Sequence, residues 1–160
     1  MKNFLLTLTL SAAMLCSCSS GGSAKPCDVD EKFSSDVKIT QDDKEYNVKL
    51  SRADADIWEL AFSEPETVKG LKLGFTGNVC TLELEGLKYE LDRKDVSQYS
   101  MASLCCGAME QLINKRELTC SEQDGVLTEK GSINGHDFSA VFEDGKIKEL
   151  TVSGQLRCEF

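Results

Sequence analysis

The chain has 160 residues, a formal net charge of -9, 41% hydrophobic and 28% charged residues, two prolines and eight cysteines. This composition suits a single globular domain and excludes a disordered chain. Acidic residues outnumber basic residues by 27 to 18, so no basic surface is available to neutralise nucleic-acid phosphates. We therefore expect no nucleic-acid partner.

The first seventeen residues have the features of a secretion signal, because Lys2 precedes a largely apolar run that is too short to span a bilayer. The run ends in Leu15-Cys16-Ser17-Cys18, which resembles the lipobox of bacterial lipoproteins. The resemblance implies cleavage before Cys18 and attachment of acyl chains such as palmitate through a diacylglyceryl group on Cys18. We expect a lipid-anchored protein on the outer face of a bacterial cell membrane, of the Gram-positive type. The alternative is a plain cleaved signal peptide.

A Gly/Ser-rich stretch follows Cys18 and predicts a flexible tether over residues 18–34. From about Asp36 apolar and polar residues alternate with a period of two, which is typical of strands with one buried face. Before the next change of period, the apolar positions fall in the ranges 37–39, 46–50, 58–62, 71–75, 80–84 and 87–91.

The period changes to three and four between about Ser97 and Lys115, which predicts an amphipathic helix. Asp95 or Ser97 is expected to cap its start, and Lys115 and Arg116 suit the negative end of the helix dipole. The apolar stripe consists of Met101, Leu104, Cys105, Ala108, Met109 and Leu112, and the opposite side carries Ser103, Cys106, Glu110 and Asn114.

Strands resume after the helix, at 118–120, 126–133, 138–142, 147–152 and 156–160. They are connected at Asp124-Gly125, Asn134-Gly135 and Asp144-Gly145, which are preferred residues for two-residue hairpin turns. The pattern predicts an α+β fold over residues 35–160. In it a curved antiparallel sheet, or half-barrel, of nine or ten strands carries one central amphipathic helix on its concave face.

Six cysteines remain if Cys18 carries lipid, and no C-x-x-C spacing points to a zinc ribbon or a thioredoxin-type site. Export permits disulfides, but the sequence leaves their pairing open. A bond within Cys105-Cys106 is disfavoured because successive helical side chains point about 100° apart. These six residues, expected to pack in the core or to form structural bridges, are Cys27, Cys80, Cys105, Cys106, Cys120 and Cys158.

No constellation of residues predicts an enzyme. The acidic clusters lack the spacing of a calcium loop. Ser35-Asp36-Val37-Lys38 matches the S-x-x-K motif of penicillin-recognising enzymes, but its companion motifs are absent. His136 is the only histidine and has no identifiable nucleophile or orienting partner. We therefore expect no catalytic residue, no metal and no cofactor.

The segment from Trp58 to Glu66, followed by Lys69-Gly70-Leu71-Lys72-Leu73, resembles a strand, a proline-bearing turn and the next strand in a family of bacterial lipoproteins. That family contains the lipoprotein-localisation proteins and the mycobacterial lipid-binding lipoproteins, and short Gram-positive members are similar in overall plan. The resemblance implies a hydrophobic ligand, such as a lipid, between the sheet and the helix. Its lining would be drawn from Trp58, Leu60, Phe62, Leu73, Phe75, Leu82, Tyr89, Met101, Leu104, Met109 and Leu112.

Three functions remain open, and the first is the anchored carrier or sensor of a hydrophobic ligand that the resemblance implies. The same apolar residues fill a dry core equally well, because alternation cannot reveal an empty space. The protein would then be an anchored interaction module for other envelope proteins. A thiol redox function of Cys105 or Cys106 is the third.

Overall fold

The computed structural model describes residues 24–160, so the predicted signal peptide and Cys18 lie outside the described residues. One antiparallel sheet contains eleven strands in the order β6-β5-β4-β3-β2-β1-β11-β10-β9-β8-β7. The strands are β1 (Phe33–Gln41), β2 (Lys44–Asp54), β3 (Ile57–Glu64), β4 (Lys72–Thr76), β5 (Val79–Leu84), β6 (Leu87–Asp92), β7 (Thr119–Gln123), β8 (Val126–Ile133), β9 (His136–Glu143), β10 (Lys146–Val152) and β11 (Leu156–Glu159). Two 3-10 turns, η1 (Glu66–Val68) and η2 (Arg93–Asp95), and the helix α1 (Met101–Asn114) complete the fold.

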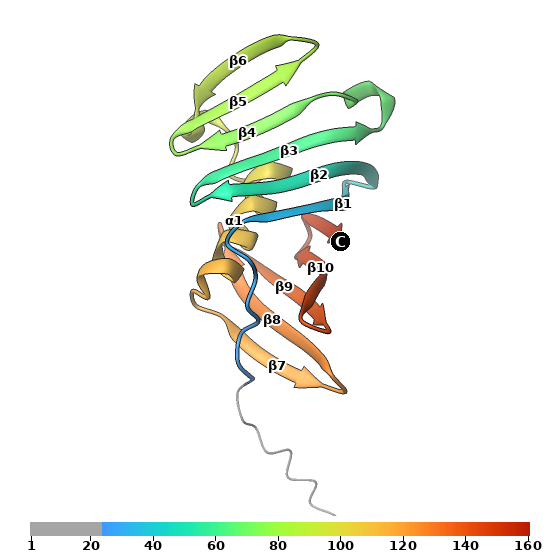
Figure 1. Ribbon diagram of the computed structural model, residues 1–160, viewed down its shortest axis with the longest axis vertical. Coiled ribbons are helices and arrows are strands. Elements are labelled where there is room, and N and C mark those ends of the chain that lie inside the picture. Colours follow the sequence, from blue (N-terminus) through green and yellow to red (C-terminus); the bar gives the residue numbers. More distant parts are fainter. Residues whose placement is uncertain (1–23) are drawn as a thin grey trace, which may run out of the picture.

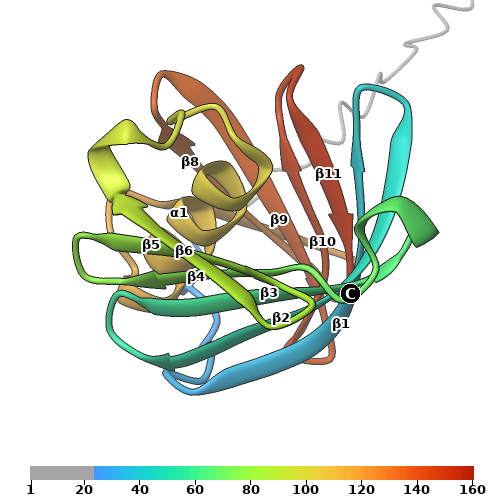
Figure 2. The same cartoon turned by 90° about the horizontal axis from the view of Figure 1, so that it is seen from above.

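The sheet is built from two meanders that join where β1 pairs with β11. Strands β1 to β6 form one half and β7 to β11 the other, and the connection between the halves contains α1. The sheet is unclosed and curved, and α1 lies inside the curve (Figures 1 and 2). This confirms the predicted α+β half-barrel with one helix on its concave face.

The predicted count of nine or ten strands is too low, because each apolar range of the sequence forms a strand of its own. The short strand β7 has the weakest burial pattern of the second half-sheet. It lies at an edge of the sheet, where Cys120 is its one half-buried residue. An edge strand buries little, so its period-two signal is weak.

The hairpin turns follow the predicted residues. Asp124-Gly125 connects β7 to β8, and Asn134-Gly135 connects β8 to β9. At both turns each residue has a positive φ, between 51° and 81°. A type I′ turn requires this conformation at its two central positions, and Asn, Asp and Gly adopt it at the lowest cost.

The helix begins later than its predicted caps. Ser100 is the N-cap, and its Oγ accepts a hydrogen bond from the Ser103 N–H at 3.2 Å. The predicted caps Asp95 and Ser97 are wrong, because Asp95 belongs to η2 and the Ser97 Oγ accepts from the Tyr99 N–H instead. The helix ends at Asn114, where Lys115 adopts a left-handed conformation.

The helix is buried on more than its predicted stripe. Leu104, Cys105 and Ala108 are fully buried, as the stripe predicts. Cys106 was placed on the polar side by the periodicity, yet its exposed fraction is 1%. This placement is wrong because the curved sheet covers the helix from two sides, so the apolar surroundings extend beyond one stripe.

Candidate functional site

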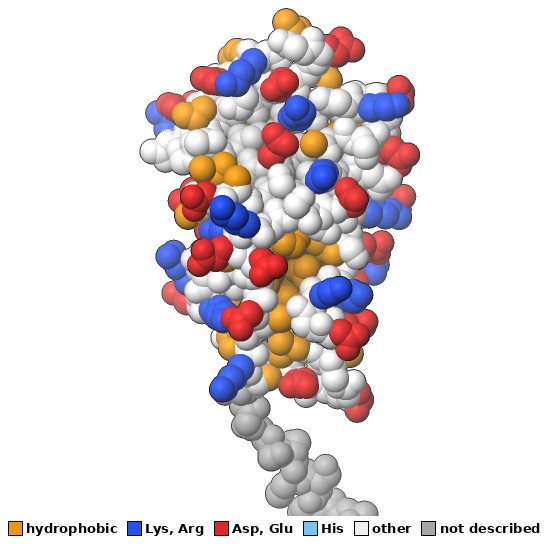
Figure 3. Space-filling model, in the orientation of Figure 1, with side chains coloured by type: hydrophobic (Ala, Val, Ile, Leu, Met, Phe, Trp, Pro, Cys, Tyr) orange, Lys and Arg blue, Asp and Glu red, His pale blue; other side chains and the backbone are white. Residues whose placement is uncertain are grey.

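A groove with both apolar and polar lining residues lies on the concave side of the half-sheet formed by β7 to β11, below the strand β1. Its volume is about 470 Å³. Figure 3 shows it as a hollow, with hydrophobic side chains at its base, in the lower half of the molecule. We call it the concave groove, and its apolar lining consists of Val29, Phe33, Phe142, Ile147 and Phe160.

Strand register explains why aromatic residues from distant parts of the sequence meet in this groove. Phe142 of β9 is paired with Ile147 of β10, so both side chains lie on the same face of the sheet. Phe33 begins β1 and Phe160 follows β11, and their rings meet edge to face at 6.0 Å between centroids. The helix does not reach this part of the concave face. The apolar residues of the sheet are therefore left to line a groove.

The segment 24–32 passes over the groove, and we call it the strap. It contains no helix or strand, yet two residues fix its first part to the domain. The Cys27 N–H donates to a Glu129 carboxylate oxygen, and the Cys27 thiol lies 3.5 Å from the Gly145 carbonyl oxygen. Asp28 forms an ion pair with Lys115. Part of the predicted tether is therefore a wall of the groove.

A buried ionic network holds the other end of the strap. The Arg52 guanidinium donates two hydrogen bonds to the Glu110 carboxylate, at 3.0 and 2.8 Å, and another to the Glu31 carbonyl oxygen of the strap. The Trp58 indole N–H also donates to Glu110, at 3.0 Å. Arg52 is 5% exposed, so this network joins α1, β2, β3 and the strap with little water around it.

Glu129 of β8 is a fully buried carboxylate beneath the strap. One of its oxygens accepts from Cys27, and the other has no hydrogen-bond partner among the described residues. Burial raises the pKa of Glu129, although the Cys27 N–H and the nearby Lys115 lower it in part. The ionised form is therefore disfavoured in the folded protein.

We expect Glu129→Gln to flatten the dependence of stability on pH. Below pH 4.5, the ordinary pKa of Glu, the carboxyl group is protonated in the folded and the unfolded protein and its burial costs no ionisation energy. As the pH rises through the higher pKa of the folded state, the buried group must ionise or hold its proton against solvent, and stability is lost. Thermal unfolding of wild type and variant between pH 4 and pH 8 measures this difference. Glu122→Gln, at an exposed position of the neighbouring strand β7, is the control. A difference between wild type and Glu129→Gln that stays constant with pH would contradict the assignment.

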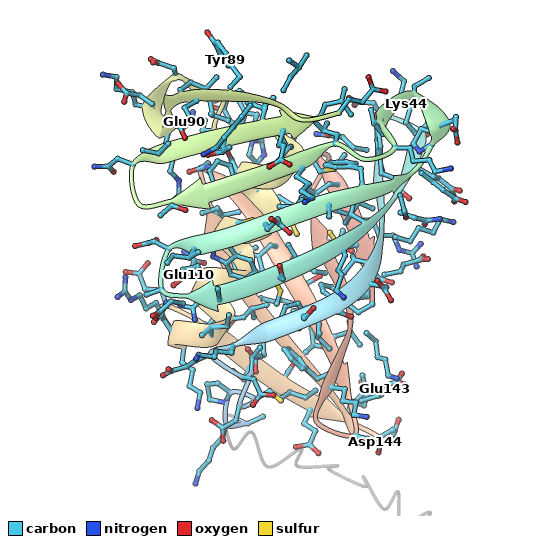
Figure 4. The ribbon with its side chains drawn as sticks, turned by 45° about the horizontal axis from the view of Figure 1, so that its top comes forward. Lys44, Tyr89, Glu90, Glu110, Glu143 and Asp144 are labelled. Atoms are coloured by element: carbon cyan, nitrogen blue, oxygen red, sulfur yellow. The ribbon has the colours of Figure 1, made fainter. Side chains whose placement is uncertain are left out.

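The ligand-lining residues predicted from the sequence lie elsewhere, mainly in the core between sheet and helix. Seven of them are at most 7% exposed, namely Trp58, Leu60, Phe62, Phe75, Leu104, Met109 and Leu112. Leu73, Leu82 and Met101 are half-buried at the border of this core. Tyr89 is 67% exposed and projects from the edge of the sheet (Figure 4). None of the eleven has its side chain in the apolar lining of the concave groove.

Sequence reasoning missed the groove residues because they are separated by more than 100 positions along the chain. Phe142 and Ile147 fall in predicted strands, but the alternation alone does not tell which buried positions the helix covers. Val29 and Phe33 belong to the predicted tether. The alternation of Phe138, Ala140 and Phe142 identifies the apolar face of β9. Knowledge of where the helix ends would have been needed to tell which of these three residues it leaves uncovered.

Residues 24–160 contain no candidate metal centre and no membrane-spanning helix. No cluster of three or more His, Cys, Asp or Glu side chains could hold a metal ion within this range. The helix in this part of the chain is too short and too polar to cross a membrane.

No protein-family model and no curated protein matches the chain. Several solved structures resemble it, among them a LolA superfamily protein from Nitrosomonas europaea, with a TM-score of 0.37 and 11% sequence identity. The match covers 79% of this chain and 55% of that chain, so it spans just over half of the neighbour's length. The resemblance is weak.

Proposed function

We propose that the protein is a membrane-anchored extracytoplasmic lipoprotein that holds a hydrophobic ligand in the concave groove. The observation that carries this proposal is the groove itself, with a volume of about 470 Å³ and an aromatic lining. Small-molecule sites commonly have volumes of roughly 300–1,000 Å³ and mainly apolar walls. An acyl chain suits these dimensions and this lining.

The border of the groove is polar. Lys32, Lys146 and Lys148 lie around it, together with Asp28 and Asp30. Asp28 is already paired with Lys115, whereas none of the three lysines forms an ion pair within residues 24–160. A ligand with an apolar tail and a polar head could therefore bury the tail among the phenylalanines while its head stays in water beside the lysines.

The predicted lipid anchor would hold the groove close to a membrane surface. Cys18 is six residues before Ala24, where the strap begins. Six residues span at most about 21 Å when fully extended. A groove wall attached so directly to an acylated cysteine would face the source of its ligand, which supports a function in binding or carrying lipid. In this proposal no residue of the chain is catalytic.

Native mass spectrometry of the protein expressed from its full sequence and purified from a bacterial membrane fraction tests both parts of the proposal. The covalent mass should show the loss of residues 1–17 and the diacylglyceryl group on Cys18. The same protein should bind a fluorescent long-chain fatty acid, and Ile147→Glu should weaken this binding at least about tenfold because it places a charge in the groove.

Val79→Glu is the matched control, because Val79 is a 39% exposed residue of β5, outside the groove lining. This variant should bind the fatty acid as the wild type does. Equal binding by Ile147→Glu and wild type would refute the groove as the site. A wild-type protein that binds no fatty acid would refute the ligand-binding function.

A second candidate function is supported by the opposite edge of the sheet. Leu87 and Tyr89 of the edge strand β6 are 80% and 67% exposed, and the neighbouring Leu84 is 39% exposed. An unpaired edge strand with apolar side chains can accept an extended segment of a partner protein as an additional strand. An anchored interaction module would use this edge and would require no ligand in the groove.

A further inference from the structure

Two buried thiols meet between the helix and the sheet. The Cys105 and Cys158 sulfurs are 3.8 Å apart, and both residues are 0% exposed. Cys105 lies in the second turn of α1, and Cys158 lies in β11. The two residues are 53 positions apart in the sequence, so the contact depends on the folded structure.

The register of the sheet fixes the position of the Cys158 side chain. Cys158 is paired with Leu150 of β10 on one side and with Ile39 of β1 on the other. All three side chains are fully buried and face α1. Cys158 therefore lies at the junction of the two half-sheets, directly below the helix residue Cys105.

We propose that Cys105 and Cys158 form a structural disulfide that attaches the helix to the junction of the two half-sheets. Free thiols in van der Waals contact need only a small side-chain movement to reach the bond length of a disulfide, about 2.05 Å. The neighbouring Cys106 is a poorer partner for Cys105, because consecutive helical side chains diverge by about 100°. The proposal selects one pair among the six cysteines, whose pairing the sequence leaves open.

The thiol exchange is favoured during folding, before α1 covers β11. In the folded protein the Cys158 thiol is hydrogen-bonded to Cys105 and buried, and both effects raise the pKa of Cys158 well above its ordinary value. The reactive thiolate is therefore disfavoured once the protein is folded. During folding, one thiolate attacks the disulfide of an extracytoplasmic oxidoreductase and forms a mixed disulfide. The second thiolate then displaces the enzyme's sulfur.

The exchange is balanced in electrons and atoms. Cys105 and Cys158 together lose two electrons and two protons, and the disulfide of the oxidoreductase accepts the electrons and leaves as a dithiol. This route rests on the proposed extracytoplasmic location, because cytosolic thiols are kept reduced. The geometric part of the inference is independent of location and can be tested separately.

Peptide mapping without reduction tests the pair. The full chain is isolated from bacterial membranes in the presence of an alkylating reagent, so that every free thiol is labelled. We expect the two peptides to be linked through Cys105 and Cys158, and the label on the helix peptide to lie on Cys106. Cys106→Ala is the matched control and should retain the link, whereas Cys105→Ala should abolish it and lower the melting temperature by about 10 °C or more.

A second experiment tests the disulfide without assuming that the protein is extracytoplasmic. The chain is unfolded, reduced and refolded with oxidised glutathione, which supplies the disulfide oxidant in place of the oxidoreductase. The same link should form. Failure of the link in the refolded protein, or a link between Cys105 and Cys106, would overturn the inference. A link that forms on refolding but is absent from cells would support the geometry and would contradict the proposed extracytoplasmic location.

Discussion

Replacing Glu110 by Gln is expected to lower the free energy of unfolding by about 3 kcal/mol, because the change leaves the Arg52 guanidinium without a counter-charge in a buried site. Arg52 is 5% exposed and donates two hydrogen bonds to Glu110. Trp58 also loses a charged acceptor. Urea unfolding followed by the fluorescence of Trp58, the single tryptophan, measures the loss.

The pH dependence of this difference has a defined sign. Burial raises the pKa of Glu110, but hydrogen bonds from Arg52, Trp58 and Asn114 together outweigh burial and lower it. A carboxyl group with a lowered folded pKa stabilises the protein above its ordinary value of 4.5, and this contribution is lost as the pH falls through the folded pKa. The difference between wild type and Glu110→Gln should therefore shrink in acid.

Two control variants separate the buried network from ordinary surface charge. Glu90 pairs with Lys88 at 2.7 Å, and both side chains are more than half exposed. Glu90→Gln should change stability by less than about 0.5 kcal/mol. A double variant, Arg52→Met with Glu110→Leu, removes both charges and should recover most of the lost stability. A loss for Glu110→Gln as small as that for Glu90→Gln would contradict the role of the network.

Leu104→Ala is expected to cost about 2–5 kcal/mol, because Leu104 is 0% exposed in the middle of the helix–sheet core. Deleting its side chain leaves a cavity that the curved sheet cannot close without moving several strands. Leu87→Ala, at an 80% exposed position, should stay within about 0.5 kcal/mol of the wild type. Chemical unfolding compares the two.

The result for Leu104 also distinguishes two locations for a ligand. A loss below about 1 kcal/mol would mean that the space between helix and sheet is loosely filled, as the sequence-based prediction of a lining there requires. A large loss, combined with fatty-acid binding that Ile147→Glu abolishes, would place the ligand in the concave groove.

Local patterns in the sequence located α1 and the strand segments of the fold. Period-two alternation located the strands, because a half-buried strand must place apolar residues on one face. The three Asp-Gly and Asn-Gly turns after the helix were recognised because few other residues adopt a positive φ at both positions. The change to a period of three and four located α1 to within a few residues of its bounds.

Only the tertiary structure decided where the candidate site lies. Phe33, Phe142 and Phe160 meet because β1 pairs with β11 across the junction of the half-sheets, a pairing between the two ends of the domain that no local pattern encodes. The strap lies over the groove because Cys27 finds its hydrogen-bond partner 102 residues away in Glu129. Burial of Cys106 likewise depends on curvature of the sheet, which a one-dimensional period does not contain. Sequence periodicity determines which face of an element is apolar, whereas long-range register determines what that face touches.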